Sequence, residues 1–127
     1  MAVLASLFLP LLMLFHLVGP VPADLGVHNG RLSPCSGPAH CAQALWTAAD
    51  PKTEFNALVN AVEALPRTQI IERTGSYLHA EVSSALFGFV DDLELLANDD
   101  GIEARSISRL GDSDLGVNAA RLAALKP

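Results

Sequence analysis

The fold is decided by residues 105–125, RSISRLGDSDLGVNAARLAAL, which join a strand, a polar loop and a helix within one short segment. Alternation over residues 102–107 predicts the strand, and Asp112 or Ser113 can cap the helix. Its spacing predicts a buried stripe made of Leu115, Ala119, Leu122 and Leu125. The loop and its flanks hold polar residues too closely spaced for a plain connection, although they match no catalytic motif: Ser106, Ser108, Arg109, Asp112, Ser113, Asp114 and Asn118.

A helix and three more strands precede this segment. Asp50 suits the N-cap, Pro51 suits the first helical position, and Pro66 ends the helix. The apolar stripe of this helix consists of Phe55, Leu58, Val59, Val62 and Leu65. Strands are predicted at 68–73 and 77–83, around the turn 74–76, and at about 87–96, before the tight-turn sequence 98–101, NDDG. Successive strands without intervening helices predict an α+β two-layer sandwich, a four-stranded antiparallel meander with two flanking helices in the order α-β-β-β-β-α.

The 127 residues can hold one domain, because about a hundred remain after the apolar first segment. We divide the chain into a signal peptide or membrane anchor at 1–23, an irregular lead-in at 24–50 and the α+β domain at 51–127. All charged residues follow Ala23, so residues 24–127 carry the whole net charge of -6. An acidic surface repels phosphate groups, which argues against nucleic acid and anionic membranes as partners.

The first segment has two interpretations. Residues 2–18 carry no charge, and the small residues Val21 and Ala23 suit a signal-peptide cleavage site, although no Lys or Arg precedes the run. As a membrane helix, the run would reach roughly 25 Å of a ~30 Å hydrocarbon core, and Pro10 interrupts it. We expect the domain outside the cytoplasm, in a periplasm, cell envelope or thylakoid lumen, either secreted or held at the membrane through residues 1–22, although the missing Lys and Arg leave the topology of an anchored chain poorly specified.

The lead-in contains the only two cysteines, Cys35 and Cys41, which enclose the sequence SGPAH. In an exported protein this pair predicts a disulfide, which would stabilise the fold by about 2 to 2.5 kcal/mol. His40 offers a third ligand for a metal site, although no fourth ligand lies at zinc-finger spacing, and free thiols are the remaining alternative. Breakers predict an irregular course for 24–50; they are Gly26, Gly30, Pro34, Gly37 and Pro38.

Several stretches together resemble the domain of unknown function 1499 family, found in exported bacterial proteins and plastid relatives. The matching stretches are 33–35 (SPC) with Cys41, 77–81 (YLHAE), 89–94 (FVDDLE), 105–106 (RS), 108–109 (SR) and 113–118 (SDLGVN), so the resemblance covers about residues 26–125. It implies no reaction, because the family has no established one. The chain departs from the family at five positions. Ala85 and Gly88 stand where relatives tend to carry Arg, and Asp112 stands where an aromatic residue is usual. Ala119 and Ala120 stand where basic residues are common. A ligand site built from such basic residues would be weakened here.

One face of the predicted sheet gathers candidate chemistry. His79 and Glu81 lie two apart on one strand, Asp92 and Glu94 can share their face on the next, and Arg105 on the one after. Such a cluster could bind a cation, or hold His79 as a general base with Glu81 nearby. The alternative is a set of cross-strand ion pairs on a solvated face, worth about 0.2 to 1 kcal/mol each.

Four polar residues need a separate explanation. Alternation turns Asp91 inward, where its carboxylate needs a partner, unless a bulge at Asp91-Asp92 turns it away. Arg109, Asp114 and Asn118 are predicted to form one unit between the fourth strand and the last helix, with Asp114 and Asn118 on a face apart from the buried stripe. That unit is either a brace, in which case Arg109→Ala costs about 1 to 3 kcal/mol, or the rim of a binding site.

Motifs for specific enzymes are poorly matched. Ser113 with His79 and an Asp misses the G-x-S-x-G spacing, Asp112 and Asp114 disfavour an anion at the last helix, and 99–101 lacks calcium-loop spacing. We therefore expect a non-enzymatic binding or accessory module for an unknown protein or small ligand, without a cofactor or metal. The alternative is a small hydrolase or metal-dependent enzyme that uses His79 and nearby carboxylates.

Overall fold

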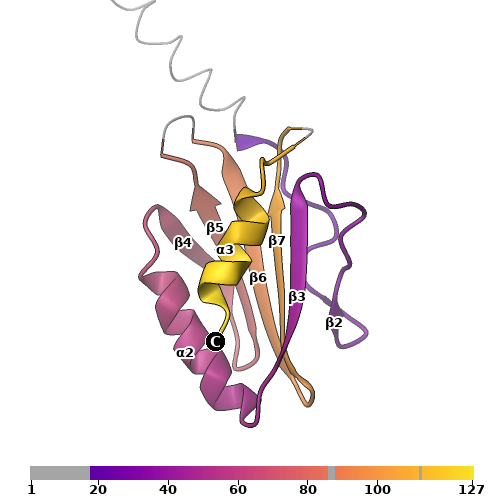
Figure 1. Cartoon of the computed structure of the whole chain (residues 1–127), viewed down its shortest axis with the longest axis vertical. Coiled ribbons are helices and arrows are strands. Elements are labelled where there is room, and N and C mark those ends of the chain that lie inside the picture. Colours follow the sequence, from indigo (N-terminus) through magenta and orange to yellow (C-terminus); the bar gives the residue numbers. More distant parts are fainter. Residues whose placement is uncertain (1–17, 86–87, 112) are drawn as a thin grey trace, which may run out of the picture.

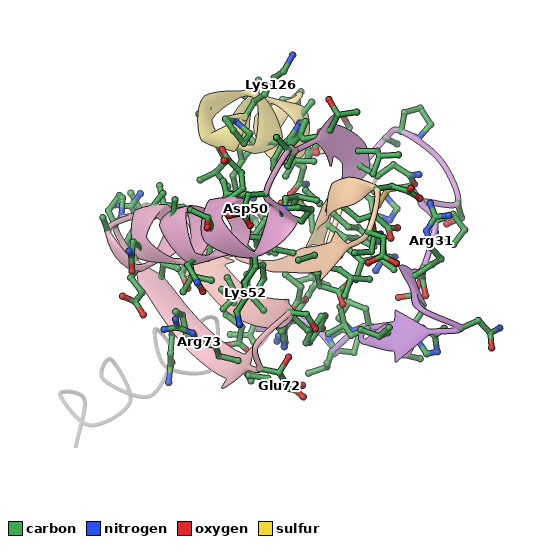
Figure 2. All side chains as sticks on the ribbon, turned by 90° about the horizontal axis from the view of Figure 1, so that it is seen from below. Arg31, Asp50, Lys52, Glu72, Arg73 and Lys126 are labelled. Atoms are coloured by element: carbon green, nitrogen blue, oxygen red, sulfur yellow. A yellow bond between two sulfur atoms is a disulfide. The ribbon has the colours of Figure 1, made fainter. Side chains whose placement is uncertain are left out.

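The computed structural model describes residues 18–85, 88–111 and 113–127. Its fold is α+β: a five-stranded antiparallel sheet of order β3-β7-β6-β5-β4 carries helices α2 and α3 on one face (Figure 1). The main elements are β3 (Cys41–Thr47), α2 (Pro51–Glu63), β4 (Thr68–Arg73), β5 (Tyr77–Ser83), β6 (Val90–Asn98), β7 (Gly101–Ser108) and α3 (Val117–Leu125). The short strands β1 (Val27–His28) and β2 (Arg31–Leu32) pair separately and lie on the opposite side from the helices, where Arg31 is seen (Figure 2).

Helix α2 forms for the reasons its sequence indicates. Asp50 Oδ1 accepts a hydrogen bond from the Thr53 backbone N–H at 3.2 Å, and Pro51 occupies the first turn, where its missing N–H costs nothing. Its buried residues, Phe55, Leu58, Val59 and Val62, pack with the inward residues of the central strands, including Leu78, Leu93, Leu95 and Ile102. Burying each large side chain contributes about 1.5 to 3 kcal/mol.

The predicted four-stranded meander is wrong in strand number, because β3 is a fifth strand inside the stretch expected to be irregular. It pairs antiparallel with β7 in an unbroken register from Cys41↔Ile107 to Thr47↔Gly101. Trp46, on the helix-facing side, is buried in the core. The breakers cluster before Cys41, so the uncharged run that follows them is free to extend along β7.

The tight turn between β6 and β7 lies where the sequence predicts it. Asn98 Oδ1 accepts hydrogen bonds from the backbone N–H groups of Asp100 and Gly101 at 3.0 and 3.1 Å. Gly101 has φ +147°, and a Cβ there would lie 2.0 Å from the Trp46 carbonyl oxygen. Only glycine fits, because the backbone of β3 passes directly against this position.

Helix α3 starts later than predicted, and its buried stripe differs. The residue at its N-cap is Gly116, in the left-handed conformation and without a side-chain cap, so Ser113 is not the cap; Asp112 lies outside the described residues. Leu115 is 93% exposed and Ala119 is also exposed, whereas the helix buries Asn118, Leu122 and Leu125. The left-handed Gly116 changes the chain direction, so Leu115 precedes the helix and does not share its buried face.

The predicted first segment falls mainly outside the described residues, since only residues 18–23 of it are placed. Among the helices that the structure describes, none is long and apolar enough to cross a membrane.

Candidate functional site

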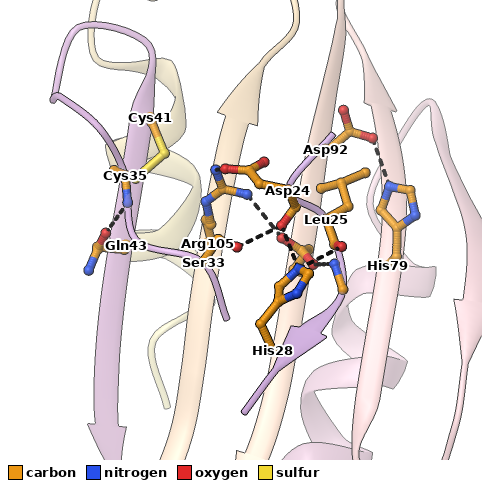
Figure 3. Close-up of polar contacts among 12 residues, drawn as sticks. Asp24, Leu25, His28, Ser33, Cys35, Cys41, Gln43, His79, Asp92 and Arg105 are labelled. Atoms are coloured by element: carbon orange, nitrogen blue, oxygen red, sulfur yellow. Dashed lines mark hydrogen bonds and ion pairs between the residues drawn. A yellow bond between two sulfur atoms is a disulfide. The ribbon is translucent and has the colours of Figure 1, made fainter. Parts of the chain in front are cut away.

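The face of the sheet opposite the helices, here called the polar face, brings the predicted cluster together. In register, His79 lies beside Glu94, Glu94 beside Arg105, and Glu81 beside Asp92. The expectation of a solvated face is wrong, because Asp92 and Glu94 have no exposed surface and Arg105 is 1% exposed. Residues 24–33, here called the arm, cross this face (Figure 3). The arm covers side chains of the polar face that would otherwise be exposed to solvent.

One half of the polar face is a chain of four side chains. His79 Nε2 lies 2.7 Å from Asp92 Oδ1. Arg109 donates two hydrogen bonds to Asp92, from Nε at 2.8 Å and from Nη2 at 2.9 Å. Its Nη2 also donates to Glu81 at 2.7 Å. Burial alone would raise the pKa of Asp92, but hydrogen bonds from Arg109 and His79 hold it below its usual range. The pKa of Arg109 is raised, first by its hydrogen bonds to Asp92 and then by its hydrogen bond to Glu81.

The other half fixes the arm to the sheet. Arg105 Nη1 donates to Glu94 at 3.2 Å and Nη2 donates to Asp24 of the arm at 2.8 Å. Glu94 also accepts from the Tyr77 hydroxyl at 2.6 Å and from the Gly26 backbone N–H at 2.8 Å. Burial, and the hydrogen bond from its hydroxyl to Glu94, raise the pKa of Tyr77. The carboxylate of Glu94 is therefore satisfied by three donors, which explains how it can be buried.

The predicted unit of Arg109, Asp114 and Asn118 is split between the two faces of the sheet. Arg109 lies on the polar face, while Asn118 is buried on the helix side. Asn118 Nδ2 donates to Ser108 Oγ at 2.8 Å and to Asp114 Oδ2 at 2.7 Å, and its Oδ1 accepts from Ser106 Oγ at 2.6 Å. Asn118 thus joins β7 to α3 without Arg109, because it lies on the same helix face as Leu122 and Leu125.

Asp114 supports the start of α3 from outside the helix. Its carboxylate accepts from the backbone N–H groups of Gly116 at 2.8 Å and Asn118 at 3.2 Å. Burial acts to raise the pKa of Asp114, yet these hydrogen bonds and that of the Asn118 side chain keep it lowered. Asp114 therefore takes the role at the N-terminus of α3, accepting hydrogen bonds from its first backbone N–H groups, that the sequence predicted for Asp112 or Ser113.

Asp91 points inward, as the alternation predicts, and the bulge at Asp91-Asp92 is absent because the register runs unbroken through both residues. Its partner is Arg121 of α3, whose Nη1 lies 2.9 Å from Asp91 Oδ2. Sequence reasoning missed Arg121, Tyr77 and Asp24. The need of an inward carboxylate for a cation is the signal that could have found Arg121.

Cys35 and Cys41 form a disulfide, with Cα atoms 5.7 Å apart, which confirms that prediction and removes the metal and free-thiol alternatives. Within the described residues, no group of three His, Cys, Asp or Glu side chains is placed to hold a metal ion. A cavity of about 170 Å³ lies between the arm and strands β3 and β7, and its lining includes Ser33, Gln43 and Arg105.

The second candidate site is the free edge of β3, which the sequence did not indicate. In the described sheet β3 is an edge strand, paired only with β7. Beside its first half lies an open groove of about 440 Å³ between the disulfide loop and α3. The residues that line it are Cys35, Gly37, Pro38, Cys41, Ala42, Gln43 and Ala119.

The register shows which residues of β3 offer backbone groups to this edge. Ser108 donates its backbone N–H to the His40 carbonyl at 2.9 Å, so hydrogen bonds to β7 recur at every second residue from 40. Gln43 and Leu45, which alternate with these residues, direct their N–H and C=O groups away from β7. Leu45 is also 55% exposed.

The family model described as "Protein of unknown function (DUF1499)" matches residues 23–126. No curated protein and no solved structure matches the chain.

Proposed function

The chain belongs to the DUF1499 family, and since this membership fixes no reaction, we propose from the geometry that it is an exported, non-enzymatic binding module. Its ligand is an extended segment of a partner protein, which adds as a strand to the free edge of β3. The observation that carries this proposal is a seven-residue edge strand without a charge or a bulge, beside an open groove.

The two edges of the sheet differ in how they are protected. Strand β4 has a bulge between Ile70 and Glu72 and carries the charges of Glu72 and Arg73, features that prevent unwanted strand pairing. Strand β3 reads CAQALWT and has neither feature. An undefended edge is a liability unless it has a partner, so the difference supports β3 as a binding edge.

The groove beside β3 supplies what strand addition needs beyond backbone hydrogen bonds. In this mode of recognition, main-chain bonds provide affinity and pockets for alternate side chains provide specificity. Ala42 and Ala119 give the groove small apolar walls, and Pro38 and the disulfide give it a rigid rim. A partner segment with small or apolar alternate residues would fit these walls.

Export is the second part of the proposal. The Cys35–Cys41 disulfide supports an oxidising compartment, such as a periplasm, cell envelope or thylakoid lumen. We expect the chain in the extracytoplasmic fraction, with an N-terminus at or near Asp24 if residues 1–23 are a cleaved signal. Fractionation and N-terminal sequencing measure both, and a soluble cytoplasmic chain that keeps Met1 would contradict this part.

The enzyme alternative has weaker support in the geometry. The ring of His79 is tied to Asp92, and Asp92 is tied in turn to Arg109. A general base needs access to a substrate proton, but the side chain of His79 is only 9% exposed. These contacts favour a structural role for the cluster.

Strand addition is tested with two substitutions at one residue. Leu45→Pro removes an outward N–H and leaves the bonds to β7 at 42, 44 and 46 in place, whereas Leu45→Thr keeps the N–H and suits a strand. Wild type, Leu45→Pro and Leu45→Thr are each used as bait against the extracytoplasmic fraction of the producing cells. The partner should be captured by wild type and Leu45→Thr and lost with Leu45→Pro.

Thermal unfolding of the three baits checks that Leu45→Pro is folded. Capture of the same partner by all three baits would contradict strand addition at β3. Sizing of wild type alone shows whether a second copy, paired β3 to β3, occupies the edge instead.

A further inference from the structure

One end of the domain carries an apolar patch, here called the tip patch, made of the exposed Phe89, Leu115 and Val117 and the partly buried Leu110. Leu115 is 93%, Val117 49% and Phe89 39% exposed. All four residues line one hollow of about 260 Å³, although they come from the starts of β6 and α3 and from the loop after β7. An apolar patch assembled from separate segments marks an interaction surface more strongly than scattered single residues do.

Leu115 combines a strained backbone with an exposed apolar side chain. Its backbone has φ +54°, a conformation that leucine adopts rarely and glycine or asparagine adopts with less strain. Its side chain is almost wholly exposed, so packing in the core does not offset the free-energy cost of this strained backbone. A leucine held here suggests an apolar environment outside the domain.

The chain enters the domain beside the tip patch. Gly19 is packed so closely on Leu110 that a Cβ at Gly19 would lie 2.7 Å from Leu110 Cγ. Figure 1 shows this entry at the same end of the sheet as the loops that precede β6 and α3. Beyond the described residues the chain continues as the uncharged apolar run 2–17. The patch therefore lies beside the point at which the apolar run 2–17 joins the domain.

We infer that the tip patch rests on the surface of a lipid bilayer and inserts its apolar side chains among neutral lipids. The net charge of -6 and the carboxylate of Asp114 beside the patch argue against attraction to anionic lipids. Contact with the bilayer is thus apolar and largely independent of salt. This inference does not depend on the binding edge β3.

Tryptophan fluorescence in vesicles tests the contact. The full chain is reconstituted into phosphatidylcholine vesicles, with and without bromine on the acyl chains, which quenches indole emission at close range. Leu115→Trp reports on the tip patch, and Leu45→Trp is the matched control, an exposed leucine on β3 outside the patch. The native Trp46 is buried, and the emission of the wild-type chain in each kind of vesicle is recorded as the background.

The emission added by Leu115→Trp should shift to the blue and be mostly lost in brominated vesicles, while that added by Leu45→Trp should be the same in both kinds of vesicle. Addition of anionic lipid should not strengthen the effect. If Leu115→Trp does not fold by circular dichroism, Val117→Trp replaces it.

Equal quenching of the two variants, or none, would overturn the inference. So would emission that is already blue-shifted without lipid and is unaffected by bromine, which would show residues 1–17 folded onto the patch. Emission that changes with protein concentration but not with bromine would assign the patch to a second copy and would also overturn it.

Discussion

Arg109→Ala probes the polar face at its best-connected residue. The side chain of Arg109 is 4% exposed and makes two bonds to Asp92, whose side chain has no exposure, and one to Glu81, which is 30% exposed. Glu81 can be rehydrated when Arg109 is lost, but Asp92 would stay buried with only His79 as a partner. Removing one member of a buried pair costs about 3 to 5 kcal/mol, and we expect the lower end of that range because His79 remains.

Urea unfolding at neutral pH measures this cost, and Arg73→Ala is its matched control. Arg73 binds Glu63 at 3.5 Å with both side chains about half exposed, so its loss should cost about 0 to 1 kcal/mol. A domain of this size has about 5 to 15 kcal/mol of stability, so Arg109→Ala should remain folded. If Arg109→Ala costs no more than Arg73→Ala, the polar face is not a brace, and its His79 and carboxylates become candidates for chemistry again.

Two further predictions concern the same networks. Asn118→Ala should lower the free energy of unfolding by about 1 to 3 kcal/mol, because Ser106 Oγ loses its buried acceptor, and an unchanged urea midpoint would show that Asn118 does not join β7 to α3. The fold lowers the pKa of Asp92, so on acidification the unfolded chain binds a proton at this residue before the folded chain does. The stability that Asp92 contributes is therefore present above its unfolded pKa of about 3.9. It is lost as the pH falls through the lower pKa of the folded state. Thermal midpoints between neutral and acidic pH should therefore fall less steeply for Asp92→Asn than for wild type, and parallel curves would refute this cause of acid unfolding.

Elements with local signals were predictable from the sequence. Asp50-Pro51 and the stripe that begins at Phe55 define α2 without reference to the rest of the chain, and Asp100-Gly101 defines the turn between β6 and β7. The alternation in β5 and β6 also assigned each residue to the correct face, including the inward Asp91. In each case the signal lies within a few residues, so tertiary contacts did not have to be known.

The features that were missed depend on distant partners. Strand β3 is a strand because β7 lies beside it, some 60 residues later in the chain, a pairing that no pattern within 24–50 reveals. The polar face looked solvated because its cover, the arm, is bound through Asp24 to Arg105. The left-handed Gly116 moved the start of α3, so the predicted stripe began with the exposed Leu115.

Amide hydrogen exchange on the bound protein tests the central claim, that β3 is the binding edge, most directly. A synthetic peptide copied from the captured partner is added to the wild-type chain, and exchange is followed at each backbone N–H. The account predicts that the outward N–H groups of Gln43 and Leu45 become protected on binding, while those of the outer edge of β4 (Thr68–Arg73) exchange as before. Protection elsewhere, with Gln43 and Leu45 exchanging at their unbound rates, would contradict it.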